Sequence, residues 1–275
     1  MATVEELLAE LKAEHKIHLI QCPFSGFSEE SVNFFDEYPV DKNEATVWWK
    51  SKGGNLETGD YQMYLKPELL SLIKSLITII SSRIDKRIQT DVNQSISKPN
   101  SQSGNRRYWP YLWGAIHYAK KEKSNKSVEI QFFINLTKMG LRVGVYVGKH
   151  PTDKGQWGAT MKRFGDRKED IFNELIFLTQ ERGYDFVKTN DQDHAIGSIG
   201  TKLIFHDAME LFNLVNNDVK EFTLLKTISK DKLYSENLIE EILEIFAETR
   251  KMYELLESPS KINQRRLITA KMSSN

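Results

Sequence analysis

The pattern of hydrophobic and polar positions divides the chain into amphipathic helices and one well-marked pair of strands. Apolar residues recur at helical spacing over 3–16, 66–84, 166–182 and 236–258. The second segment opens at Lys66-Pro67, and proline is favoured in the first turn of a helix. We therefore predict a helix over each of the four segments.

The strand pair comprises 127–137 and 141–149, joined by a tight turn in which Gly140 can take a positive φ. In the second strand, Leu141, Val143, Val145 and Val147 alternate with Arg142, Gly144, Tyr146 and Gly148. This alternation predicts one buried and one exposed face. Because the two glycines leave the second face bare, we expect a helix or a ligand to lie across it. Weaker patterns predict strands at 17–22, 46–50, 107–121, 184–188, 201–207 and 220–229, with loops at 150–165 and 189–200.

These elements predict an α+β fold. We expect a mainly antiparallel sheet built around the central hairpin, covered by the amphipathic helices 66–84 and 166–182, with a C-terminal helical appendage. The division is an α+β domain over 1–229, followed by a C-terminal helix and basic tail over 230–275. The polar connection 89–107 is long, and connections of this length are often functional.

The composition narrows the class of protein. Lys and Arg together number 38, as do Asp and Glu, so the net charge of zero argues against a chain coated in nucleic acid but permits a local basic groove. The single cysteine, Cys22, excludes an internal disulfide and a cysteine-based zinc site, and suits a reducing compartment. The N-terminus lacks the pattern of a signal peptide, and the apolar run 69–80 is too short to span a bilayer. We predict a cytoplasmic protein with no membrane contact and no cofactor.

Basic residues next to aromatic ones are the main functional signal, because they grip phosphates and stack bases. The candidate nucleic-acid-binding residues are Arg106, Arg107, Tyr108, Trp109, Trp113, Lys120 and Lys121, with Lys162 and Arg163 in a second basic patch. The alternative interpretation is that the aromatic residues are core and the lysines form a solvated edge.

Catalytic signatures are weak. None of the six histidines stands in an HExxH, HxH or HxE arrangement. Asp193 and His194 share a loop, and His206 follows a predicted strand, so a metal-dependent hydrolase or nuclease site there is one alternative. The spacing of a PD-(D/E)xK nuclease is missing. We predict no catalytic residue and no metal ligand.

Two resemblances bear on function. The segments YLKPELLSLIKSLITII, ISK, RYWPYLWGAIHYA and LRVGVYVG resemble the layout of a bacterial α/β domain family of unknown function over about 61–180. The hairpin 128–149 and the helix LIEEILEIFAETRKMYELLES resemble N-terminal DNA-recognition domains of McrB-like proteins from modification-dependent restriction systems. The second resemblance implies a DNA-recognition module. Since these 275 residues hold no Walker A motif, its AAA+ motor and nuclease subunit would lie on other polypeptides or would have been trimmed away.

Three functions therefore follow from the sequence. The leading one is a non-catalytic DNA-binding, target-recognition module of a restriction or defence system. The second is a protein–protein interaction adaptor that uses the aromatic face and the C-terminal helix, without nucleic-acid binding. The third is the metal-dependent hydrolase or nuclease.

Overall fold

The computed structural model describes residues 3–22, 24–51, 65–83, 111–117, 130–149 and 156–257. Its helices in the N-terminal part are α1 (Val4–His18), α2 (Glu29–Val32), α3 (Lys42–Ser51) and α4 (Leu65–Arg83), with a 3-10 turn at Leu19–Gln21. Those in the C-terminal part are α5 (Gln156–Asp166), α6 (Lys168–Ile176), α7 (Asp191–Ile196), α8 (Ala208–Asn213) and α9 (Leu238–Leu256). Short π-helical turns extend α6 over Phe177–Glu181 and α8 over Leu214–Val219, and a 3-10 turn covers Lys230–Lys232. No helix in these ranges is long and apolar enough to cross a membrane.

The strands form one six-stranded sheet in the order β1-β2-β3-β6-β4-β5, and neighbouring strands are antiparallel throughout. The strands are β1 (Tyr111–Ile116), β2 (Ile130–Thr137), β3 (Gly140–Gly148), β4 (Asp185–Lys188), β5 (Thr201–Lys202) and β6 (Glu221–Ile228). The predicted α+β class and mainly antiparallel sheet are confirmed, and the predicted hairpin is the β2–β3 pair near the centre of the sheet.

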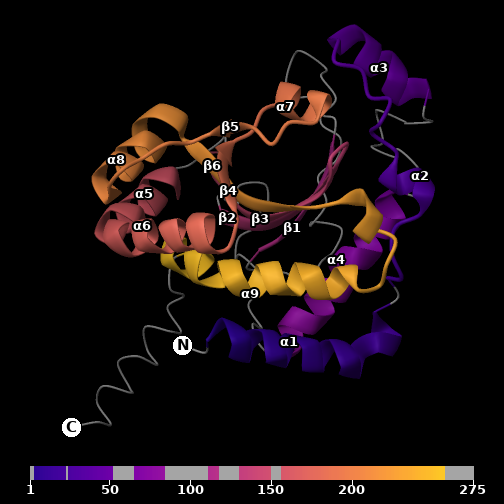
Figure 1. Ribbon diagram of the computed structural model, residues 1–275, viewed down its shortest axis with the longest axis horizontal. Helices are drawn as coiled ribbons and strands as arrows, with labels where there is room; N and C mark the ends of the chain where they lie inside the picture. Colours follow the sequence, from indigo (N-terminus) through magenta and orange to yellow (C-terminus); the bar gives the residue numbers. More distant parts are fainter. Residues whose placement is uncertain are drawn as a thin grey trace.

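Helix α9 lies between the sheet and α1 (Figure 1). It packs against β2 and β3 on one side and against α1 on the other, and α4, α5 and α6 also contact it. The sequence predicts this helix to be a C-terminal appendage, whereas in the structure it forms a central layer of the core. The physical reason is that its buried surface is broader than one stripe and extends to Ala247, Glu248 and Thr249.

Two segments predicted as strands are helical. The apolar run 17–22 continues α1 to His18 and then forms the 3-10 turn, because no glycine or proline interrupts the chain before Pro23. The segment 46–50 belongs to α3, whose first turn is capped by Asp41: its Oδ1 accepts from the backbone N–H groups of Asn43 at 2.8 Å and Glu44 at 3.1 Å. Capping decided the outcome against the local β propensity.

Two predicted loops contain helices. Residues 156–166 form α5, with Trp157, Thr160, Met161 and Phe164 buried at helical spacing. Residues 191–196 form α7, which begins with a capping box between Asn190 and Asp193. The strand predicted at 201–207 shrinks to the two residues of β5.

The hairpin turn behaves as predicted. Gly140 has a φ of +120°, and a Cβ there would lie 2.3 Å from the carbonyl oxygen of Ile228. The predicted exposed face of β3 is wrong, because Arg142, Gly144 and Gly148 are buried together with the apolar set. A Cβ on Gly144 would meet the β6 backbone, and the Tyr146 side chain fills the space above Gly148. Close contacts within the sheet therefore explain why both positions are glycine, without the need for a helix or ligand lying across them.

Candidate functional site

The second face of the sheet is the face opposite α9, and it carries a row of polar and aromatic side chains. We use this name for Tyr111, Trp113, Phe133, Asn135, Arg142, Tyr146, Val187, Leu225 and Thr227, which the strand register places on one side. Phe133, Val187 and Leu225 form a small buried cluster there, separate from the main core. Helix α7 lies on this side of the sheet (Figure 1).

Trp113 is the candidate nucleic-acid-binding aromatic residue that the structure describes. Its ring stacks on Phe133 with 4.7 Å between centroids and meets Tyr146 edge-on at 5.3 Å. Its Nε1 donates a hydrogen bond to Gln131 at 3.0 Å. Strand β1 is an edge of the sheet, so this half-buried ring belongs to an aromatic platform at that edge. Arg106, Arg107, Tyr108, Trp109, Lys120 and Lys121 lie outside the described residues.

The second basic patch lies on α5, which packs against α9. Lys162 is exposed on α5. Arg163 donates from Nε to the carbonyl oxygen of Leu256 at 2.8 Å, and Arg167 donates to that of Leu255 at 2.9 Å. These two arginines satisfy carbonyls at the last turn of α9, where cations also suit the helix dipole.

A buried arginine marks the centre of the second face. Arg142 is 1% exposed, and its Nη1 lies 2.8 Å from Nδ1 of His194 on α7. Its Nη2 donates to the carbonyl oxygen of Ser198 and approaches the sulfur of Met139. Among the carboxylates whose side chains the structure describes, none lies at ion-pair distance from this guanidinium. The buried charge of Arg142 is therefore stabilised by hydrogen bonds and by more distant carboxylates.

The electrostatics follow from burial. Burial lowers the pKa of Arg142 to about 10, while the charges of Asp193 and Asp185 act in the opposite direction. Burial, and then the charge of Arg142, hold the pKa of His194 well below its usual value. At neutral pH the site therefore contains a charged guanidinium and a neutral imidazole, and the imidazole ring lies 4.4 Å from that of Tyr111.

Several buried polar atoms on this face have no hydrogen-bond partner. They are Nε of Arg142, Oδ1 of Asn135 and Oγ1 of Thr227, which are cross-strand neighbours in one row. Such atoms are uncommon in a folded protein, because each loses its hydration on burial. Sequence reasoning missed this row. The one available signal was a charged residue inside an otherwise apolar strand.

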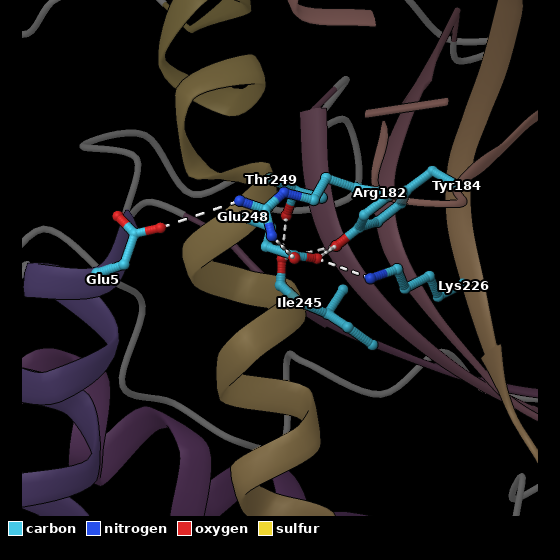
Figure 2. A network of polar contacts seen from close by, with 7 residues as sticks. All are labelled: Glu5, Arg182, Tyr184, Lys226, Ile245, Glu248 and Thr249. Carbon is cyan, nitrogen blue, oxygen red and sulfur yellow. Dashed lines mark hydrogen bonds and ion pairs between the residues drawn. The ribbon is translucent and has the colours of Figure 1, made fainter. Parts of the chain in front are cut away.

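Figure 2 shows a second buried polar cluster, around Glu248 of α9. Its Oε2 accepts from the Tyr184 hydroxyl at 2.7 Å and from Nζ of Lys226 at 2.8 Å, and its Oε1 lies 3.7 Å from Arg182. Arg182 also reaches Glu5 of α1 at 3.9 Å. Burial, followed by the bond to Glu248, raises the pKa of Tyr184 far above its usual value. These contacts join α1, α9 and the sheet.

The candidate residues of a metal-dependent hydrolase or nuclease are Asp193, His194 and His206. The first two make hydrogen bonds within the protein. Asp193 accepts from the backbone N–H of Asn190 at 3.1 Å and from the Ser198 hydroxyl at 2.8 Å, and His194 contacts Arg142. His206 is exposed in the loop before α8. The described residues contain no group of three or more His, Cys, Asp or Glu side chains that could hold a metal ion.

The fold places the chain among α+β proteins whose antiparallel sheet has one face covered by a main helical layer. No family model matches the sequence, and no curated protein matches it. The resemblances drawn from the sequence patterns therefore stay predictions.

Proposed function

We propose that this chain is a non-catalytic DNA-binding module of a restriction or defence system, which works beside a separate motor or nuclease subunit. The main support for the proposal is the position of β1 in the sheet and in the sequence. It is an edge strand, it presents Tyr111 and Trp113 on the second face, and in sequence it lies between Arg106-Arg107 and Lys120-Lys121. An aromatic platform between two basic segments suits a charged polymer that carries flat bases.

Two further lysines support this arrangement. Lys138 follows Thr137, which pairs with Tyr111 at the start of β1. Lys149 follows Gly148 at the end of β3, two strands away from β1, and is exposed. The six residues of β1 span about 20 Å at ~3.3 Å per residue, a length equal to about six phosphate steps along one DNA strand.

A salt titration of DNA binding tests the proposal. If Arg106, Arg107, Lys120 and Lys121 each neutralise one phosphate, the plot of log K against log salt has a slope of about −3.6 for duplex DNA. The double variant Arg106→Ala/Arg107→Ala removes two of these charges, and we expect a slope of about −1.8 and weaker binding at every salt concentration.

A matched control removes the same net charge elsewhere. Lys16 of α1 and Lys74 of α4 are exposed, and both helices lie on the α9 side of the sheet. The variant Lys16→Ala/Lys74→Ala should keep the wild-type slope. Absence of binding at low salt, or equal slopes for the two double variants, would refute the proposal.

A protein–protein adaptor is the second candidate, and one observation favours it. Ile17, Leu19 and Ile20 at the end of α1 are 61%, 51% and 99% exposed. Three neighbouring apolar side chains in water are a common feature of contact surfaces. The adaptor function would be preferred if the chain bound no DNA and a charge-conserving Ile20→Lys/Lys16→Ile variant lost a protein partner.

A further inference from the structure

Helix α7 is a small, self-contained element on the second face. Its first turn is closed by the capping box of Asn190 and Asp193, and its end is closed by Gly197 with a φ of +78°. Ala195 is buried, whereas Ile196 is 55% exposed, so the helix buries little apolar surface. Its attachment to the sheet therefore depends strongly on the contacts of His194 and Ser198 with Arg142.

The contact between Arg142 and His194 requires one protonation state. A guanidinium has only N–H donors, so Nδ1 of His194 must accept the hydrogen bond from Nη1 at 2.8 Å. The imidazole is therefore neutral and carries its proton on Nε2. A second proton, on Nδ1, would place two N–H groups and two positive charges against each other in a buried position.

The other ionisable groups near this contact do not remove the conflict. Tyr111 of β1 faces His194 with its ring. Asp193 of α7 and Asp185 of β4 act on the charge of Arg142. Asp193 is already committed to the backbone N–H of Asn190 and to Ser198. Among the carboxylates whose side chains the structure describes, none pairs with the imidazole ring itself.

We propose that α7 is a proton-operated lid on the second face, closed while His194 is neutral and released when His194 takes up a proton. Release separates His194 and Ser198 from Arg142 and exposes Tyr111 at the edge strand. The buried Nε of Arg142 and Oδ1 of Asn135, which have no partner in the closed form, gain water on opening, and this lowers the free energy that opening requires. The inference does not depend on DNA binding.

The direction of the pH effect follows from linkage. The pKa of His194 is depressed in the closed form and is close to 6.5 when the lid is open. Above about pH 6.5 neither form binds the extra proton, so the lid has its full stability. As the pH falls below this value only the open form is protonated, and from pH 7 to pH 5 the opening equilibrium rises about 25-fold.

Hydrogen exchange of the full chain between pH 5 and pH 7, corrected for the intrinsic exchange rate, measures this opening. We expect the protection of amides in 191–198 to fall about 25-fold over the range. Amides of the buried helix α9 should keep their protection, because α9 packs on the opposite face of the sheet from His194.

Two variants distinguish opening of α7 caused by protonation of His194 from a general loss of stability at low pH. In His194→Asn, the amide oxygen takes the place of Nδ1 as acceptor but cannot be protonated, so the protection of α7 should become independent of pH. In His206→Asn, the exposed histidine is removed and the wild-type pH dependence should remain. An unchanged pH dependence in His194→Asn would overturn the proposal, as would pH-independent protection in the wild-type protein.

A second measurement covers the case in which His194→Asn fails to hold α7 closed. A nitrogen NMR titration of the wild-type imidazole reports its tautomer and its protonation directly. We expect an Nε2–H tautomer at pH 7 and protonation that coincides with the loss of α7 protection. Protonation of His194 without any change in α7 exchange would refute the lid.

Discussion

Glu248 provides the sharpest test of how the helical layer is fixed to the sheet, and Glu248→Ala is the perturbation. The carboxylate is 5% exposed and accepts from Tyr184, which is 4% exposed, at 2.7 Å. Its loss leaves the buried hydroxyl without its charged acceptor, which lowers the free energy of unfolding by about 1.5–3 kcal/mol. The pair with Lys226 contributes only about 0.5 kcal/mol, since that side chain is 30% exposed and regains water.

Removal of the buried methylenes adds about 1–2 kcal/mol through the cavity that they leave. The free energy of unfolding should therefore fall by about 3–5 kcal/mol, in line with the loss of one partner from a buried polar pair. Glu248→Gln keeps the shape and an acceptor for Tyr184, so we expect about half of this loss. Glu244→Ala, on an exposed position one turn earlier in α9, should change stability by less than about 0.5 kcal/mol.

Urea denaturation followed by circular dichroism measures these differences. A double-variant cycle with Tyr184→Phe gives the coupling directly, because in the Glu248→Ala background the hydroxyl has lost its charged acceptor and keeps only the long bond of 3.5 Å to the carbonyl oxygen of Ile245. Tyr184→Phe should then be nearly neutral there, and should cost about 1–3 kcal/mol in the wild type. A Glu248→Ala protein within about 1 kcal/mol of the wild type, or strictly additive single changes, would show that the cluster in Figure 2 does not hold the layers together.

Two further predictions concern the backbone approach of the strands and the end of α9. A Cβ on Gly144 would lie 2.0 Å from the carbonyl oxygen of Leu224, so Gly144→Ala should destabilise the protein by more than about 2 kcal/mol in thermal denaturation. Gly158→Ala, in the open on α5, should instead stabilise it by about 0.5–1 kcal/mol. Arg163→Met should increase amide exchange in the last turn of α9, because a carbonyl there loses its donor, whereas Lys162→Met at the exposed neighbour should not.

Periodicity in the sequence determined the long helices and the central hairpin. The stripes of α4 and α9 and the alternation of β3 are repeated many times, so a single contrary residue does not change the element that they specify. Gly140 likewise defined the turn, because few other residues tolerate its φ. Short segments behaved differently. The run 17–22 and the segment 46–50 were decided by helix continuation and by capping at Asp41, against their β propensity.

Only the tertiary structure decided which surfaces became interior. The alternation in β3 predicted an exposed second face, yet packing by distant parts of the chain buried Arg142 to 1% exposure. The alternation could not reveal this, because burial depends on what lies above a strand and not on the strand itself. The same reason applies to the contact of Arg142 with His194 and to the position of α9 between the sheet and α1. The local sequence pattern determines whether a segment forms a helix or a strand. Segments far away in the sequence determine whether each of its side chains is buried and what it contacts.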